Sequence, residues 1–255
     1  MLGTHDYRTL DAGKIVSTIE TLSARINERF PGAGLASVSA ELGNIAIASR
    51  TRILTIERRH IPLRIAVALV VTAAVWLLIR ILPFIDLSKT TPDTVYTLLQ
   101  GIEAAMNIFV LIGATLLFLF TVEERVKRRR ALMALHELRT IAHVIDMHQL
   151  TKDPSAVTGG LPQTEHSPVR TMTPPELIRY LDYCSEMLSL TAKVAALYAQ
   201  SLPDAVVTEA VSDLERATAN MSQKIWQKIM IVEAQQSAAM SAALQSSGVS
   251  PKVEV

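Results

Sequence analysis

The sequence has one cysteine, few aromatic residues and almost no net charge. A single cysteine, Cys184, excludes a framework of internal disulfides. The net charge of +1 gives no overall positive field of the kind that attracts nucleic acid, so no nucleic-acid partner is expected. Aromatic residues make up 5% of the chain although hydrophobic residues make up 49%, so the apolar content is aliphatic and rich in alanine. That composition is typical of helices and of segments that face lipid.

Sequence motifs for nucleotide binding and for nucleophilic catalysis are also missing. The chain has no GxSxG, no phosphate-binding P-loop and no GxGxxG. Its Gly-Gly pair, Gly159 with Gly160, lies in a stretch rich in Pro, Gly, Ser and Thr, without a strand before it. Cys184 falls on a heptad position of a predicted helix, which favours a buried structural thiol over a reactive one. We therefore predict no cofactor, and a non-enzymatic role is favoured over an enzyme.

Two long apolar runs, 61–85 and 104–122, dominate the hydropathy pattern. About 20 apolar residues are needed to cross the hydrocarbon core of a bilayer. The first run is uncharged from Ile65 to Ile79, and the second carries no charge at all. A buried hairpin of a soluble protein is the alternative, but arginines flank both runs. The pattern thus predicts two transmembrane helices in contact with a lipid bilayer, with Arg80 reaching toward the headgroups rather than acting as a buried functional charge.

Basic residues cluster on one side of the two predicted spans. Those before the first span are Arg50, Arg52, Arg58, Arg59 and Arg64, and those after the second are Arg125, Lys127, Arg128, Arg129 and Arg130. The connecting segment, 86–103, has Lys89 as its one basic residue. By the positive-inside rule, this segment is a short external loop and both termini are cytoplasmic. We expect an integral protein of the plasma (inner) membrane.

The rest of the chain has the pattern of amphipathic helices, which makes the fold class all-α. Residues 1–60 are predicted to form a cytosolic helical hairpin, with Ile15, Ile19, Leu22 and Ile26 on one face, a break at 30–34 and a second helix at about 40–59. Residues 151–172 are predicted to be a flexible linker and 247–255 a disordered tail. Between them, 173–246 are predicted to form a second cytosolic hairpin. It begins with a capping box, Thr173 with Glu176, and breaks at 201–204.

A heptad pattern runs without proline from the second span into a predicted cytosolic stalk, 123–150. Its positions are Asn107, Val110, Ala114, Leu117, Thr121, Glu124, Arg128, Ala131, Leu135, Leu138, Ala142, Ile145 and Gln149. Such spacing predicts a coiled-coil-like seam along one long helix. Asn107, Ala114 and Thr121 are small or polar, which permits close packing between helices in lipid. The seam can pack on the first span of the same chain or lie at the axis of a homo-oligomer.

Three of the six histidines lie near the end of this stalk. His136 and His143 share one helix face, but they are separated by roughly 10.5 Å along the axis, too far to bind one zinc ion together. His143 and Asp146, three residues apart, could share a metal with a ligand from another helix. Otherwise His136, Arg139, His143 and Asp146 form either an interhelical or intersubunit polar network or a hydrated face beside the packed seam.

Long interaction-type helices outweigh any pattern that resembles a reaction site. We therefore expect a membrane scaffold or signal-coupling subunit that self-associates into a homo-oligomer and whose cytosolic helices can bind a protein partner. The first alternative is an oligomeric ion or small-solute channel lined by Asn107, Ala114 and Thr121, although a TVGYG potassium filter is missing. A weaker alternative is a metal-dependent membrane enzyme that uses His143 and Asp146.

Overall fold

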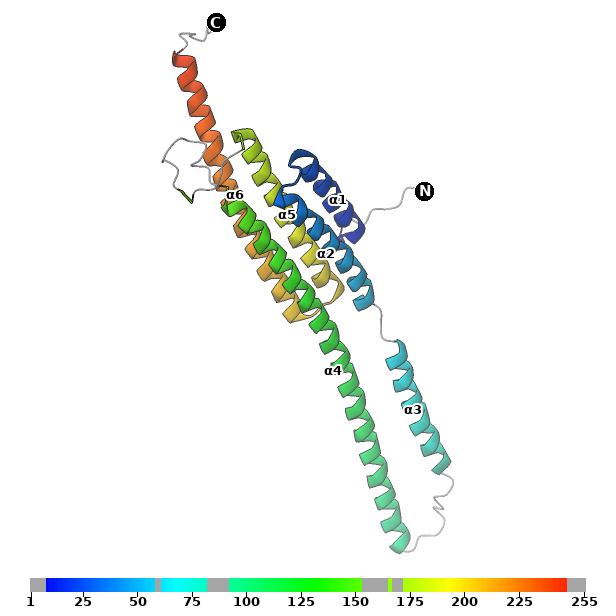
Figure 1. Cartoon of the computed structure of the whole chain (residues 1–255). Helices are drawn as coiled ribbons and strands as arrows, with labels where there is room; N and C mark the ends of the chain where they lie inside the picture. The colour runs from blue at the N-terminus through cyan, green and yellow to red at the C-terminus, as the bar shows by residue number, and fades with distance from the viewer. Residues whose placement is uncertain (1–7, 58–60, 82–91, 153–164, 167–171, 247–255) are drawn as a thin grey trace, which may run out of the picture. The chain divides into compact units, whose positions relative to one another are not determined.

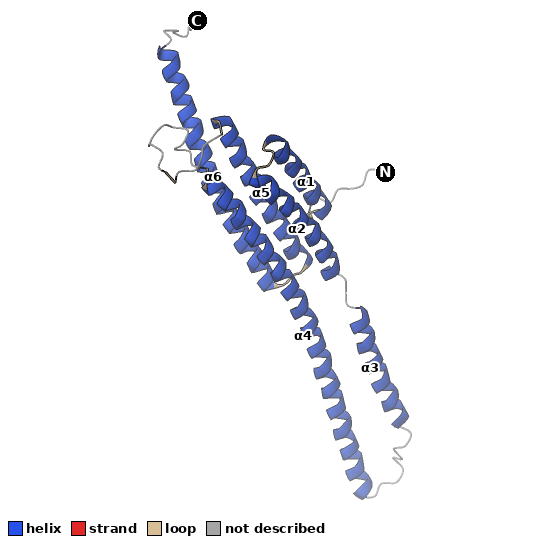
Figure 2. Ribbon diagram, viewed as in Figure 1, coloured by secondary structure: helices blue, strands red, loops and turns tan. Residues whose placement is uncertain are grey.

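The computed structural model describes residues 8–57, 61–81, 92–152, 165–166 and 172–246, and these residues form helices and short connections without a strand (Figure 2). The six helices are α1 (Ala12–Arg29), α2 (Gly34–Glu57), α3 (Ile61–Ile81), α4 (Pro92–Leu150), α5 (Pro174–Ser201) and α6 (Ala205–Ser246). The chain divides into two units. One, the bundle unit, combines residues 1–55 with 131–255, and the other, the apolar unit, is 56–130. The helix α4 contributes to both.

In the bundle unit, α1, α2, α5, α6 and residues 131–150 of α4 lie side by side (Figure 1). The hydrophobic heptad positions predicted from the sequence form its core, because a continuous apolar stripe on each helix must be covered by its neighbours. On α1 and α5, the buried heptad residues are Ile15, Ile19, Leu22, Ile26, Leu177, Leu181, Cys184, Leu188, Thr191, Ala195 and Tyr198. On α6, they are Val207, Val211, Leu214, Met221, Ile225 and Val232. The predicted apolar face of Ile15, Ile19, Leu22 and Ile26 is confirmed, as is the buried heptad position of Cys184.

The ends of the helices follow from local sequence signals. The Asp11 carboxylate accepts hydrogen bonds from the first backbone N–H groups of α1, which lowers the pKa of Asp11. Gly32, between α1 and α2, has φ +73°, a left-handed conformation that glycine adopts without strain. At the start of α5, the Glu176 carboxylate accepts from the backbone N–H and the hydroxyl of Thr173, each at 2.8 Å. Asp204 caps α6 in the same way as Asp11 caps α1.

The apolar unit contains α3 and the first part of α4. Among the described residues, one helix is long and apolar enough to cross a membrane, Leu99–Leu150, and none of its apolar window is buried. The first predicted span, 61–85, is helical from Ile61 to Ile81, and the remainder lies outside the described residues. Exposed large apolar side chains include Leu69, Trp76, Phe109, Leu111, Leu117 and Phe118. In this unit, these large apolar side chains lie on the helix surface and are not covered by other residues of the chain.

Two helices begin earlier than the sequence pattern predicted. α4 begins at Pro92, so much of the predicted loop 86–103 is helical. A proline at the first helical position favours this start. α2 begins at Gly34 rather than near Ala40, and Leu35 in its first turn is fully buried. Most of the predicted linker, 151–172, and all of the predicted tail, 247–255, lie outside the described residues.

Candidate functional site

The segment 131–150 of α4 has a buried inner face and an exposed outer face. The buried residues are Ala131, Ala134, Leu135, Leu138, Ile141, Ala142, Ile145 and Gln149, which contain the predicted heptad positions of this segment. His136, Arg139 and His143 lie on the exposed side, and Asp146 is half-buried. In this segment the predicted seam therefore packs within the chain's own bundle.

The structure places Asp146 in a contact that the sequence analysis did not name. Its Oδ1 accepts a hydrogen bond of 2.6 Å from Nε2 of Gln149, and Gln149 is itself buried. Among the described residues, no group of three His, Cys, Asp or Glu side chains is placed to hold a metal ion. His143 is exposed, and its imidazole ring would be a single ligand for a metal ion. The geometry thus gives Asp146 a structural partner inside the bundle.

Lys228 of α6 completes this polar contact at the end of α4. Its Nζ donates to Oε1 of Gln149 at 2.7 Å, to the backbone oxygen of Gln149 at 2.9 Å and to that of Lys152 at 3.4 Å. The last carbonyl groups of a helix have no partner within the helix, and a cation satisfies them while it also complements the helix dipole. Lys228 thereby fixes the C-terminal end of α4 against α6. The sequence contains a signal for it, because Lys228 lies between the buried Ile225 and Val232 at heptad spacing.

A second polar contact joins α2, α4 and α5. Arg52 donates to Oε2 of Glu137 at 2.6 Å, and this carboxylate raises the pKa of Arg52. The Tyr198 ring is fully buried beside the pair. Burial raises the pKa of Tyr198, and the nearby Ser49 hydroxyl and Arg52 guanidinium oppose that shift. In the sequence, Arg52 belongs to the basic cluster before the first span, and nothing predicts this ion pair, since the partners are 85 positions apart in the chain.

Ring systems pack closely at the C-terminal end of α4, the same end that Lys228 contacts. A Cβ atom at Gly34 would lie 2.6 Å from Cε1 of His148, so the third stalk histidine packs directly against the start of α2. The Phe30 ring meets Tyr180 edge-on, with 5.5 Å between centroids. Lys152 Nζ lies 5.0 Å from the centroid of the same Tyr180 ring, within the range of a cation–π contact. His148 therefore has a packing role.

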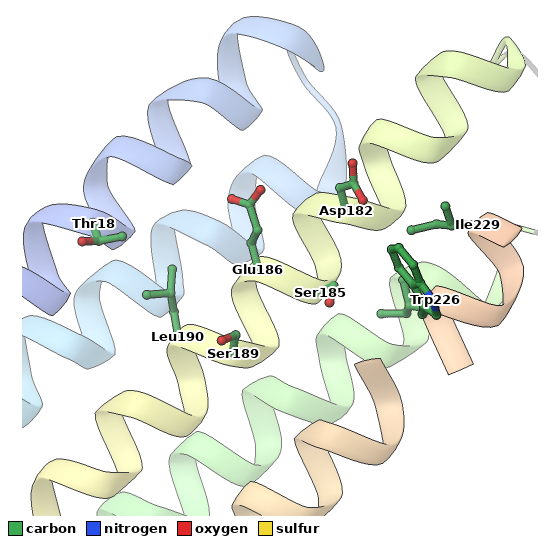
Figure 3. Close-up of a pocket in the computed structure, with 9 residues that line it drawn as sticks. Thr18, Asp182, Ser185, Glu186, Ser189, Leu190, Trp226 and Ile229 are labelled. Carbon is green, nitrogen blue, oxygen red and sulfur yellow. The ribbon is translucent and has the colours of Figure 1, made fainter. Parts of the chain in front are cut away.

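An open groove of about 560 Å³ lies between α1, α5 and α6 (Figure 3). Its lining residues are Thr18, Asp182, Ser185, Glu186, Ser189, Leu190, Ile225, Trp226 and Ile229. In Figure 3 the side chains of α5 form the floor, and Trp226 and Ile229 stand on the α6 side. Trp226 is 59% exposed, and Glu186 pairs with Arg25 at 3.7 Å. The floor is mostly polar, which suits hydration.

Three predicted seam residues of the apolar unit are exposed: Asn107, Ala114 and Thr121. The hydroxyl of Thr121 donates to the backbone oxygen of Leu117 at 2.8 Å, so it is satisfied within its own helix.

In the bundle, burial raises the pKa of the Cys184 thiol to about 12. The prediction that Cys184 is buried is confirmed, and its low reactivity stays a prediction.

Comparisons with protein families, curated proteins and solved structures gave no match to the chain. The function must therefore be inferred from three features of the molecule. They are an exposed apolar helix, a packed helical bundle and the uncovered outer face of α4.

Proposed function

We propose that this chain is a two-span protein of the plasma (inner) membrane, with both termini cytoplasmic, and that its helical bundle is a self-associating scaffold or signal-coupling module. The observation that carries the proposal is α4, one unbroken helix of 59 residues. One part of it is apolar and exposed, as lipid requires, and the other part is buried among the bundle helices. Because both parts belong to one continuous helix, a displacement of the membrane segment is coupled to the bundle.

The second span and the orientation rest on the sequence pattern. Residues 61–81 are helical and nearly all apolar. Arginine and lysine residues precede 61 and follow 122, and cytoplasmic loops carry such an excess. The same clusters would lie where anionic headgroups attract basic side chains. Both clusters on one side require an even number of crossings, which two spans satisfy.

The proposal is tested on the full chain in a lipid nanodisc and in cells. We expect resistance to alkaline extraction from membranes, cytoplasmic reporter activity at both termini and a particle mass of two or more chains. A Leu117→Arg substitution should weaken membrane insertion by about 2.5–3.5 kcal/mol, the cost of arginine near the centre of a span, whereas Leu117→Ile should not. A C-terminal reporter on the outside would overturn the topology, and a strictly monomeric particle would overturn self-association.

A channel is the second candidate, favoured by the exposed Asn107 amide on a mostly apolar helix surface. An amide in the hydrocarbon region is costly unless it meets water or another polar group. If the chain conducts, reconstituted bilayers should show a conductance that Asn107→Leu alters and Ile108→Leu does not. Bilayers that contain oligomeric protein without any conductance would exclude this candidate and leave the scaffold proposal standing.

A further inference from the structure

The outer face of α4 in the bundle unit carries a second heptad pattern that no part of the described chain covers. Its positions, here called the outer seam, are Met133, His136, Thr140, His143, Met147 and Leu150. The steps between them are three, four, three, four and three residues. All six are exposed, and the three large apolar side chains are strongly so, with Met133 at 53%, Met147 at 66% and Leu150 at 62%. This spacing places the six side chains along one stripe of the helix, where Met133, Met147 and Leu150 are large apolar side chains left uncovered.

The spacing indicates what kind of surface the outer seam fits. A 3.5-residue repeat keeps one stripe facing a partner helix that runs nearly along it. The opposite stripe of α4, centred on Leu138, is already buried in the bundle. The inner stripe is therefore occupied by the chain's own helices, and the outer seam is left for a helix from another molecule.

The chemistry of the outer seam favours a second copy of this chain. Two copies inserted in one membrane have the same orientation, so their α4 helices run parallel and each seam residue meets its own counterpart across a two-fold axis. Self-pairing excludes like charges, and none of the six residues is an Asp, Glu, Lys or Arg. Methionine packs against methionine, and a neutral imidazole both donates and accepts, so it can bond to an identical ring. The charged Arg139 and Asp146 lie outside the seam.

We propose that the outer seam is a homodimer interface, in which two α4 helices form a parallel, in-register coiled coil with His136 and His143 paired across the axis. This inference rests on the proposed function and names the surface through which self-association takes place. The polar residues cost some stability at seam positions, but they fix the register of the two helices. Confinement to a membrane raises the effective concentration of the second copy, which offsets that cost.

Site-directed crosslinking tests the interface in the full membrane-inserted chain. Cys184→Ala removes the native thiol, and single cysteines are then placed on the seam at Thr140, His143 and Met147. The matched controls are Arg139→Cys, exposed on the same helix beside the seam, and Ala24→Cys, exposed on α1. Mild oxidation should give disulfide-linked dimers at the three seam positions, fewer at Arg139 and none above background at Ala24. Seam positions that crosslink no better than Ala24 overturn the interface.

A charge test uses His143→Lys with His143→Leu as the paired variant. Lysine places like charges across the axis and should weaken dimerisation by about tenfold or more, whereas leucine should strengthen it. Dimerisation is measured by single-molecule photobleaching in bilayers, and the circular dichroism melt of each variant reports whether the bundle is folded. The wild-type chain could oligomerise while the seam cysteines fail to crosslink or the His143 variants show no charge effect. That result overturns the interface but leaves self-association standing. Monomeric wild-type chains overturn both proposals.

Discussion

Two segments of the same helix differ in how their apolar side chains are covered. In residues 131–150 of α4, one stripe of apolar residues recurs every three or four positions and is buried by the chain's own helices. In the part before residue 123, apolar side chains surround the helix and are exposed. A striped helix can be covered by one set of neighbours, whereas a helix that is apolar all round needs an apolar medium or contacts on every side. The difference shows that the spacing of the hydrophobic residues, rather than their number, determines which segment packs against the chain's own helices.

A pair of leucine truncations gives the largest test of this difference. Leu138 is fully buried in the bundle, and Leu117 is 71% exposed in the apolar part of the same helix. Leu138→Ala should lower the free energy of unfolding of the bundle by about 2–5 kcal/mol, because it removes buried methyl groups and leaves a cavity. Leu117→Ala should leave it within about 0.5 kcal/mol. Urea unfolding followed by tryptophan fluorescence measures both, and equal effects would contradict the division into a packed and an uncovered segment.

The next test concerns how the packed segment is held at its end. Lys228→Met keeps the length of the side chain but leaves the Gln149 amide oxygen and the last carbonyls of α4 without their donor. Burying such groups unpaired costs about 1–3 kcal/mol. Lys224→Met on the exposed side of α6 is the matched control and should have little effect. Hydrogen exchange should also show faster opening of the last turn of α4 in the Lys228 variant. If exchange protection of this turn is the same in the Lys228 variant as in wild type, Lys228 has no capping role.

Residues with a local cause were those that the sequence predicted best. Thr173 and the heptad leucines act through spacing, which is visible in the chain. Lys228 and the Arg52–Glu137 pair depend on which helices become neighbours, and that arrangement arises from tertiary packing. From the sequence, the outer face of α4 is predicted to be either a hydrated face or a polar network. Its heptad spacing became a distinct feature once the structure showed which stripe the bundle already uses.

A smaller effect is expected at alkaline pH, from the thiol at the centre of the bundle. Burial raises the pKa of Cys184 from 9.0 to about 12, so the folded protein holds the proton more tightly than the unfolded chain does. Below pH 9 both states keep the proton and stability is unaffected by this group. Between pH 9 and 12 the unfolded state ionises first, so stability falls by up to about 1.4 kcal/mol per pH unit. The raised pKa of Tyr180, also due to burial, adds to the slope above its usual value of 10.0.

The contribution of the thiol is isolated by comparing wild type with Cys184→Ala. Their free energies of unfolding, measured in urea, should converge by about 1.3 kcal/mol between pH 8 and pH 10, because the variant has lost one titrating group. Native Cys184 should also resist alkylation at pH 8 and react once urea unfolds the bundle. A thiol that reacts quickly in the folded protein would place it outside the packed core.

The smallest effect is expected where α2 meets α4. The Arg52–Glu137 bond is short, at 2.6 Å, but the two side chains are 41% and 43% exposed, so water and salt screen the pair. Exposed ion pairs contribute about 0.2–1 kcal/mol, and a double-mutant cycle with Arg52→Ala and Glu137→Ala should give a coupling energy in that range. The coupling should shrink as salt rises from about 0.1 M to 1 M, because the screening length falls from roughly 10 Å to 3 Å. A salt-independent coupling above this range would mean that the pair is desolvated, and that the contact with Tyr198 belongs to the packed core rather than to its rim.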